Sequence, residues 1–294
     1  MRRLTCPFAA AILVVVMAVP TRVEAWGFEA HRFIMSRAIA LLPAPIRPFF
    51  EAERATIVER AIDPDLWRTA GWPGESERHF VDLDAYGAPP FKDLPRDRDE
   101  AIKKFGKEFV EKNGTLPWRT EEYYGKLVEA FQMKSPYSRD NIRYFSSIVA
   151  HYVSDAHVPF HAALNYDGQL TQQTGIHARF ESELFERYRA RLRVVPKPVM
   201  PIVNARDFTF EALEGSFPLV QSILDADKRA VGNREVYDDG YFAMFFGRVR
   251  PTLETRLADS ITAVASMITA AWIEAGRPSI PLQVPKTPRK VRRE

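Results

Sequence analysis

The sequence is poor in cysteine and, after its first 20 residues, in long apolar runs. Cys6 is the one cysteine among 294 residues, and it lies near the start of the chain. Without it the chain has no disulfide and no thiolate ligand, so any metal must be held by nitrogen and oxygen. No later run approaches the roughly 20 apolar residues of a membrane-spanning helix. We therefore expect a soluble protein once the leader is removed.

The first 25 residues have the composition of a secretory leader. Arg2 and Arg3 form a basic start, residues 6–19 are nearly all apolar, and Ala25 ends a short segment that a signal peptidase accepts. We predict that residues 1–25 are a signal peptide cleaved after Ala25. The mature chain then begins at Trp26 and is secreted or periplasmic.

Charge excludes one class of function. The net charge is +3, but the excess of basic residues lies in the leader and in the tail after Ile280. The body between them is close to neutral, which does not suit a protein that binds duplex DNA. The tail, residues 281–294, is rich in proline and basic residues and is expected to be disordered.

Helical patterns dominate the remainder. Apolar residues recur at helical spacing in residues 31–42, 142–153, 180–188 and 253–272. Strand-like alternation is scarce, and the proline-rich stretches 85–95 and 194–202 are typical of loops. We predict one all-α domain of many helices over residues 26–280.

Several histidines lie close in sequence to carboxylates, at spacings that favour metal binding. His151 and Asp155 lie four residues apart on one helical stripe, so their side chains share a face. His177 and Glu181 repeat this spacing, and His161 lies between the two pairs. An imidazole and a carboxylate on each of two helices is a common way to hold metal inside a helical bundle. This donor set suits zinc, and ligand type alone leaves manganese or iron open.

Five motifs, in order, carry a family resemblance. They are Trp26-Gly-Phe-Glu-Ala-His31, Asp65-Leu-Trp-Arg68, His79-Phe-Val-Asp82, His151-x3-Asp155-x5-His161 and His177-x3-Glu181. Over residues 26–183 the chain resembles the superfamily of zinc-dependent phospholipases C and single-strand-specific nucleases. The resemblance implies an all-α domain with a metal cluster at the bottom of a cleft.

The resemblance also implies three zinc ions and their ligands. Asp65 is preferred over Asp63 because of its Asp-x-x-Arg context. The mature chain of that family begins with a tryptophan whose amino group and carbonyl oxygen bind metal, so cleavage after Ala25 would create a ligand. The implied ligand sets are Asp65, His79, His151 and Asp155 for the first ion, His161, His177 and Glu181 for the second, and Trp26, His31 and a second oxygen of Asp155 for the third.

Further roles follow from the same resemblance. The ions would activate water for attack on phosphorus, with Asp65 as a ligand at the catalytic centre and Arg68 neutralising charge on the phosphate. Glu29 is expected to be either a base or headgroup contact or an exposed carboxylate in the first turn of its helix. Phe80 and Asp82 are expected to shape the substrate pocket. His157 matches no ligand of the family.

The identity of the ester is less constrained. Glu181, the His161-Ala-Ala segment and the lack of disulfides resemble the bacterial phospholipase C branch, whereas Asp65-x-x-Arg68 resembles the nuclease branch. We favour a phospholipase C-like phosphodiesterase. A single-strand nuclease or 3′-nucleotidase is the alternative, and a non-catalytic zinc-binding exported protein is a second one. The expected partner is a phospholipid or single-stranded nucleic acid as substrate, bound by a monomer with no protein partner and no stable membrane anchor.

Overall fold

The computed structural model describes residues 26–280, and every regular element in this range is helical. The predicted leader and the predicted disordered tail lie outside the described residues. The predicted all-α fold is confirmed.

The elements are α1 (Phe28–Ile39), α2 (Arg47–Ala52), α3 (Arg54–Arg60), α4 (Asp63–Thr69), η1 (Ser76–Arg78), η2 (Leu83–Tyr86), α5 (Arg98–Phe105), α6 (Lys107–Lys112), α7 (Leu116–Gln132), α8 (Ser138–Asp155), η3 (Pro159–Ala162), α9 (Ile176–Ala178), η4 (Arg179–Glu183), α10 (Leu184–Tyr188), η5 (Arg189–Arg191), α11 (Ala205–Ser216), α12 (Leu219–Val231) and α13 (Asp239–Glu274).

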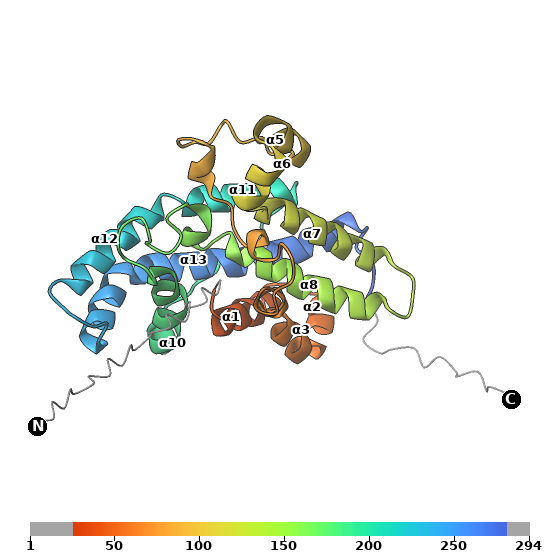
Figure 1. The fold of residues 1–294 in the computed structure, drawn as a ribbon. Coiled ribbons are helices and arrows are strands. Elements are labelled where there is room, and N and C mark those ends of the chain that lie inside the picture. The colour runs from red at the N-terminus through yellow and green to blue at the C-terminus, as the bar shows by residue number, and fades with distance from the viewer. Residues whose placement is uncertain (1–25, 281–294) are drawn as a thin grey trace, which may run out of the picture.

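The longest helix, α13, forms the spine of the molecule. It spans 36 residues and packs against α1, α7, α8 and α12 (Figure 1). The apolar stripe that predicted a helix over residues 253–272 faces the core, where Leu257, Ile261 and Val264 are fully buried. The helix ends just before Gly276, whose φ of 85° lies in the left-handed region that glycine adopts without strain.

Helix α8 brings together the segments that carry candidate ligands. It pairs with α7 and also contacts α1, α3, α4 and α13. Ser147 on α8 donates a hydrogen bond to the carbonyl oxygen of Ile57 at 2.9 Å, which fixes α3 against it. The helix ends at Asp155, and Pro159 begins η3 four residues later. The residues that follow therefore turn back across the end of α8.

The predicted helix over residues 180–188 is interrupted. A three-residue α9 leads into a π-helical turn, η4, before α-helix resumes at α10. Single π turns inside helices are often found at functional sites, and this one contains Glu181. Apolar periodicity does not distinguish a π turn from a regular helix, so the sequence alone did not predict it.

A small pair of helices, α5 and α6, stands apart from the main body (Figure 1). It follows the predicted loop over residues 85–95, which contains no helix beyond Tyr86. Among the described helices, none combines the length and the apolar composition needed to cross a membrane.

Candidate metal centre

Five predicted ligands meet in one buried cluster, which we call the first cluster. His31 lies on α1, Asp65 on α4 and His79 directly after η1, and His151 and Asp155 lie one turn apart on α8. All five side chains are between 0% and 2% exposed. Each of the sets His31–Asp65–His151 and His79–His151–Asp155 offers ligand atoms that lie within 4.8 Å of one another.

Asp155 lies at the middle of the first cluster. Its Oδ2 is 3.0 Å from Nδ1 of His79 and 3.3 Å from Nε2 of His151, and its Oδ1 is 3.3 Å from Nε2 of His31. The two oxygens therefore face different histidines. A carboxylate in this arrangement can bridge two metal ions, one on each oxygen.

Three further ligands form the second cluster, His161, His177 and Glu181. Their ligand atoms also lie within 4.8 Å of one another, and Nε2 of His177 is 3.0 Å from Oε2 of Glu181. His161 lies on η3, so the turn after α8 brings it to the start of α9. Nδ1 of His161 lies 2.5 Å from the carbonyl oxygen of His79, which joins the two clusters.

A buried ion pair with α12 fixes α9 and η4, the elements that carry His177 and Glu181. Arg179 lies between the two ligands in sequence, and its Nη2 is 3.4 Å from Oδ1 of Asp227 on α12. Its Nε donates a hydrogen bond to the hydroxyl of Tyr241 at 3.0 Å. Asp167 accepts hydrogen bonds from the backbone N–H groups of Gly175 and His177. These contacts fix the backbone of α9 and of the π turn.

The electrostatics differ between the two clusters. Burial lowers the pKa of His161 to about 4 and lowers that of His177 well below its usual value, so both rings are neutral near pH 7. Neutral imidazoles are the form that binds metal. In the first cluster, burial disfavours the charged form of His79, but the hydrogen bond to Asp155 and the nearby carboxylates of Glu75 and Asp65 prevail and raise its pKa to about 9. A metal ion that binds there must displace a proton from His79.

Buried atoms without hydrogen bonds provide a test of whether the residues fit a metal. Nε2 of His31, Oδ2 of Asp65 and Oδ1 of Asp155 have no hydrogen-bond partner among the described residues. Leaving such groups buried and unsatisfied costs free energy. Their convergence with the required mix of imidazoles and carboxylates fits a site for cations such as zinc.

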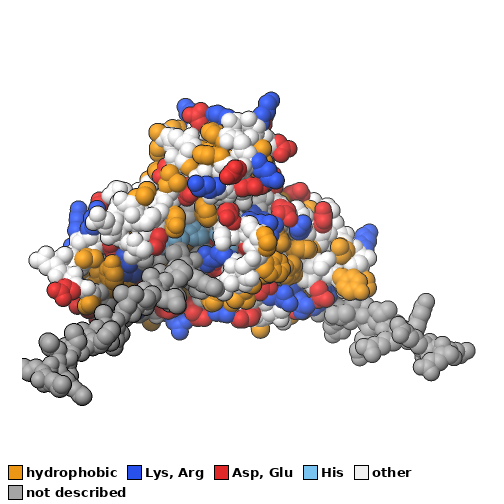
Figure 2. Space-filling model, in the orientation of Figure 1, with side chains coloured by type: hydrophobic (Ala, Val, Ile, Leu, Met, Phe, Trp, Pro, Cys, Tyr) orange, Lys and Arg blue, Asp and Glu red, His pale blue; other side chains and the backbone are white. Residues whose placement is uncertain are grey.

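A cavity of about 650 Å³ opens above both clusters. Its lining includes the ligands His79, His161 and His177 together with Arg68 and Phe80. Figure 2 shows histidine side chains at the floor of a hollow bordered by hydrophobic groups. Metal ions held by the clusters would thus be accessible to a substrate, as a catalytic site requires.

The structure separates Asp65 from Asp63. Asp65 is fully buried, and its oxygens lie 3.9 Å from Nε2 of His31 and from Nδ1 of His79. Asp63 instead faces Arg60 at 3.3 Å near the surface. Asp65, and not Asp63, therefore lies where a carboxylate could join the first cluster.

Arg68 and Glu29 occupy different environments. Nη2 of Arg68 lies 3.0 Å from Oδ1 of Asp65, and the side chain borders the cavity. Glu29 is 45% exposed, and its contacts are to Arg32 at 3.0 Å and Arg189 at 3.3 Å. No contact of the described residues joins Glu29 to either cluster. A catalytic role for Glu29 stays a prediction that these contacts do not support.

Trp26 is buried beside the first cluster. Its indole Nε1 donates a hydrogen bond of 3.0 Å to the carbonyl oxygen of Ser154, the residue before Asp155. The side chain is fully buried although it lies at the edge of the described chain. This contact holds residue 26 against the end of α8.

Asp82 is a buried carboxylate at the cavity wall. It is 6% exposed, and its Oδ1 has no hydrogen-bond partner among residues 26–280. Burial, with a smaller contribution from the charge of Asp84, raises the pKa of Asp82 to about 7. Its ionisation in the folded protein is therefore costly, which is a typical property of a group reserved for a ligand.

Asparagine at position 82 should stabilise the protein at alkaline pH. The folded pKa of about 7 lies above the ordinary value of 3.8, so the stability that the protonated form provides is lost as pH rises from about 4 to 7. D82N lacks this loss, and we expect its free energy of unfolding at pH 8 to exceed the wild-type value by up to about 4 kcal/mol. Urea titrations at pH 4 and pH 8 provide the measurement. An equal difference at both pH values would show that Asp82 does not titrate as described.

Several residues of the site carry no motif and were missed by the sequence analysis. Glu75 lies below His79, and Leu164, Tyr166 and Leu170 border the mouth of the cavity. For Glu75 the only signal was its position four residues before a ligand histidine. The three mouth residues lie on the loop between the ligands His161 and His177, where spacing conveys no orientation.

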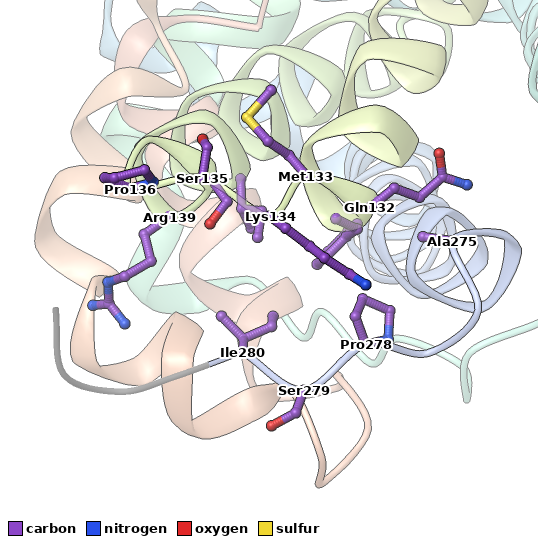
Figure 3. Close-up of a pocket in the computed structure, with 13 residues that line it drawn as sticks. Gln132, Met133, Lys134, Ser135, Pro136, Arg139, Ala275, Pro278, Ser279 and Ile280 are labelled. Atoms are coloured by element: carbon purple, nitrogen blue, oxygen red, sulfur yellow. The ribbon is translucent and has the colours of Figure 1, made fainter. Parts of the chain in front are cut away.

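A second cavity lies away from the ligands. It has a volume of about 540 Å³ and is bounded by the α7–α8 turn and the segment after α13 (Figure 3). Met133, Pro278 and Ile280 give it an apolar wall, and no predicted ligand lines it. It is therefore separate from both clusters.

Comparison with known proteins identifies the fold. No family model and no curated protein sequence matches the chain. The structure is similar to that of the alpha-toxin of Clostridium perfringens from avian strain SWCP, with a TM-score of 0.51 and 12% sequence identity over 84% of this chain and 64% of the toxin. The alpha toxin of Clostridium absonum gives a TM-score of 0.45 and 13% identity over 84% of this chain and 63% of the toxin. The chain thus spans less than two thirds of either toxin. The likeness to the first toxin supports the fold expected from the resemblance to zinc-dependent phospholipases C and nucleases.

Proposed function

We propose that this chain is an exported zinc-dependent hydrolase of phosphate esters, acting as a phospholipase C-like phosphodiesterase. The observation that carries the proposal is the convergence of eight buried histidine and carboxylate ligands at the floor of an open cavity. The first cluster and Trp26 would hold two ions, and the second cluster would hold a third. Bound zinc would supply Lewis-acid chemistry, polarising water and phosphate oxygens.

Residues around the ions would bind and orient the ester. The guanidinium of Arg68 borders the cavity and would pair with a phosphate oxygen. Its contact with Asp65 fixes its position before substrate arrives. Phe80 would pack against the group attached to the phosphate. Both clusters are 0% to 4% exposed, so charge interactions within them would be screened little by solvent.

The mouth of the cavity favours a lipid substrate. Leu164, Tyr166 and Leu170 border it with 38%, 46% and 69% of their surfaces exposed. Their loop is held by its own hydrogen bonds, including Gln169 Nε2 to the carbonyl oxygen of Leu164 at 2.7 Å. Exposed apolar groups beside an active-site opening, here two leucines and the ring of a tyrosine, suit contact with acyl chains better than contact with sugar and phosphate. We call these three residues the apolar lip.

Nuclease activity is a second candidate because of two other residues of the cavity lining. Phe80 provides an aromatic face, and Asp82 provides a buried carboxyl group with one oxygen that has no hydrogen-bond partner. Stacking on an aromatic ring and hydrogen bonding to the base edge are the usual means of binding an unpaired nucleobase.

An assay of the zinc-loaded chain beginning at Trp26 tests the proposal. We expect hydrolysis of phosphatidylcholine vesicles to exceed that of single-stranded DNA, RNA and 3′-AMP. Hydrolysis of the nucleic acids alone would favour the nuclease. Hydrolysis of none by metal-replete protein would refute both enzymes and leave the non-catalytic zinc-binding protein. Hydrolysis that resists a chelator would refute the zinc mechanism.

Substitution of Leu170 tests the apolar lip. Inserting a leucine side chain into lipid contributes about 1.5 kcal/mol or more, so Leu170→Ser should lower the ratio of vesicle hydrolysis to soluble phosphodiester hydrolysis about tenfold. Val203→Ser is the matched control, because Val203 is 100% exposed and does not line the cavity. An unchanged ratio for Leu170→Ser would rule out the lip as a lipid contact.

A further inference from the structure

Glu75 is a fully buried carboxylate beneath the first cluster. It precedes η1, four residues before His79. Oε1 lies 3.7 Å from Nε2 of His79 and accepts a short hydrogen bond from the hydroxyl of Tyr152. Oε2 accepts a hydrogen bond from Nη1 of Arg78 at 2.6 Å and lies 3.6 Å from Nη2 of Arg119.

The ring of His79 lies between Glu75 and the cluster. Its Nδ1 is 3.0 Å from Oδ2 of Asp155 and 3.1 Å from Nε2 of His151, so this nitrogen faces the metal site. Its Nε2 points the other way, toward Oε1 of Glu75 at 3.7 Å, which is longer than a hydrogen bond, and has no other partner among the described residues. The two nitrogens of one imidazole thus face two carboxylates.

Two other candidate ligands are oriented in the same way but by backbone. Nδ1 of His151 lies 2.8 Å from the carbonyl oxygen of Ala61, which leaves its Nε2 for the cluster. Nδ1 of His161 lies 2.5 Å from the carbonyl oxygen of His79. A hydrogen bond at the outer nitrogen fixes the tautomer and the ring orientation of a metal-bound histidine.

We propose that Glu75 is a positioning residue that fixes His79 for metal binding through Nδ1. It would accept the proton of Nε2–H, leaving the lone pair of Nδ1 directed at the ion and making the imidazole a stronger donor. This inference rests on the proposed zinc site. It adds a residue that contacts no metal and that belongs to none of the sequence motifs.

Three groups besides His79 hold the carboxylate of Glu75. The hydroxyl of Tyr152 and the guanidinium of Arg78 donate hydrogen bonds to it, and the guanidinium of Arg119 lies 3.6 Å away. Tyr152 also packs edge-on against the rings of His79 and His151, with centroid distances of 5.5 Å to both. The carboxylate is therefore held from three sides, and its remaining side faces His79.

Zinc affinity of a Glu75→Gln variant tests the inference. Glutamine keeps the shape of the side chain and removes its charge, so the fold is preserved more readily than with alanine. In the chain beginning at Trp26, competition with a chromogenic chelator should show zinc affinity at the first cluster lowered about 10- to 100-fold. The ion at the second cluster should keep its wild-type affinity and serves as an internal reference.

A matched variant separates the positioning of His79 by Glu75 from the contact that Glu75 makes with Arg119. Glu122 is the other carboxylate partner of Arg119, at 2.7 Å on the surface side, and Glu122→Gln should leave zinc affinity unchanged. Wild-type affinity in Glu75→Gln would overturn the inference, even if its metal-free form were less stable. If that variant does not fold, Tyr152→Phe decides: an affinity about three- to tenfold lower supports the inference, and an unchanged one overturns it. Failure of the wild-type chain itself to bind zinc would instead refute the proposed function.

Discussion

Replacing Asp155 with asparagine should remove the metal from the first cluster and abolish hydrolysis. The two oxygens of Asp155 face three histidines, at distances of 3.0 to 3.3 Å. An amide carries no charge and presents only one acceptor oxygen, so it cannot bridge two ions. Loss of outer-sphere groups typically costs 10- to 100-fold in metal affinity or activity, and loss of this shared ligand should exceed about 100-fold in kcat/KM. Zinc content after dialysis and steady-state kinetics are the two measurements.

Asp63→Asn is the matched control for this variant. Asp63 lies on the same helix as the ligand Asp65 but faces Arg60 near the surface. Its substitution should leave zinc content and kcat/KM within about twofold of wild type, as expected of a surface ion pair. If Asp155→Asn retained its full zinc content, the first cluster could not be the metal site.

Retaining Ala25 before Trp26 should remove the third zinc ion. A free α-amino group has a pKa near 7.7 and readily yields its proton to a metal, whereas an internal amide nitrogen is a poor ligand. The indole of Trp26 is already anchored on Ser154, so the start of the mature chain would lie beside His31 and Asp155. We expect two bound ions in place of three and a loss of activity of at least tenfold.

The N-terminal test contains its own control. The same protein, with a removable extension before Trp26, can be measured before and after the extension is cleaved. Cleavage should restore the third ion and the activity together. Three ions and full activity in the uncleaved protein would refute the role of the Trp26 amino group.

Two pairs of candidate ligands were predictable from sequence because their spacing follows helix geometry, whereas the other ligands were implied only by the family resemblance. His151 and Asp155 lie four residues apart on α8, and a four-residue step places both on one face of a regular helix. The buried stripe of α13 was readable for the same reason. Such local patterns depend only on the helical repeat and not on the rest of the fold.

Contacts across the fold were not accessible in this way. Glu75 meets Tyr152 and Arg119 only because α7 and α8 pack against the segment around η1. The exposure of Leu170 depends on the hydrogen bonds that shape its loop. The direction in which Glu29 points was likewise not predictable, since a carboxylate two residues before a ligand histidine can turn toward surface arginines. No spacing along a single sequence reveals contacts of this kind, because they depend on how distant segments pack.

The most direct test of the central claim is an anomalous difference map at the zinc edge, from crystals of the chain beginning at Trp26. We predict three zinc peaks: one among Asp65, His79, His151 and Asp155, one among His161, His177 and Glu181, and one among Trp26, His31 and Asp155. Crystals grown with excess zinc that showed no peak at either cluster would contradict the proposed metal centre and the hydrolase built on it.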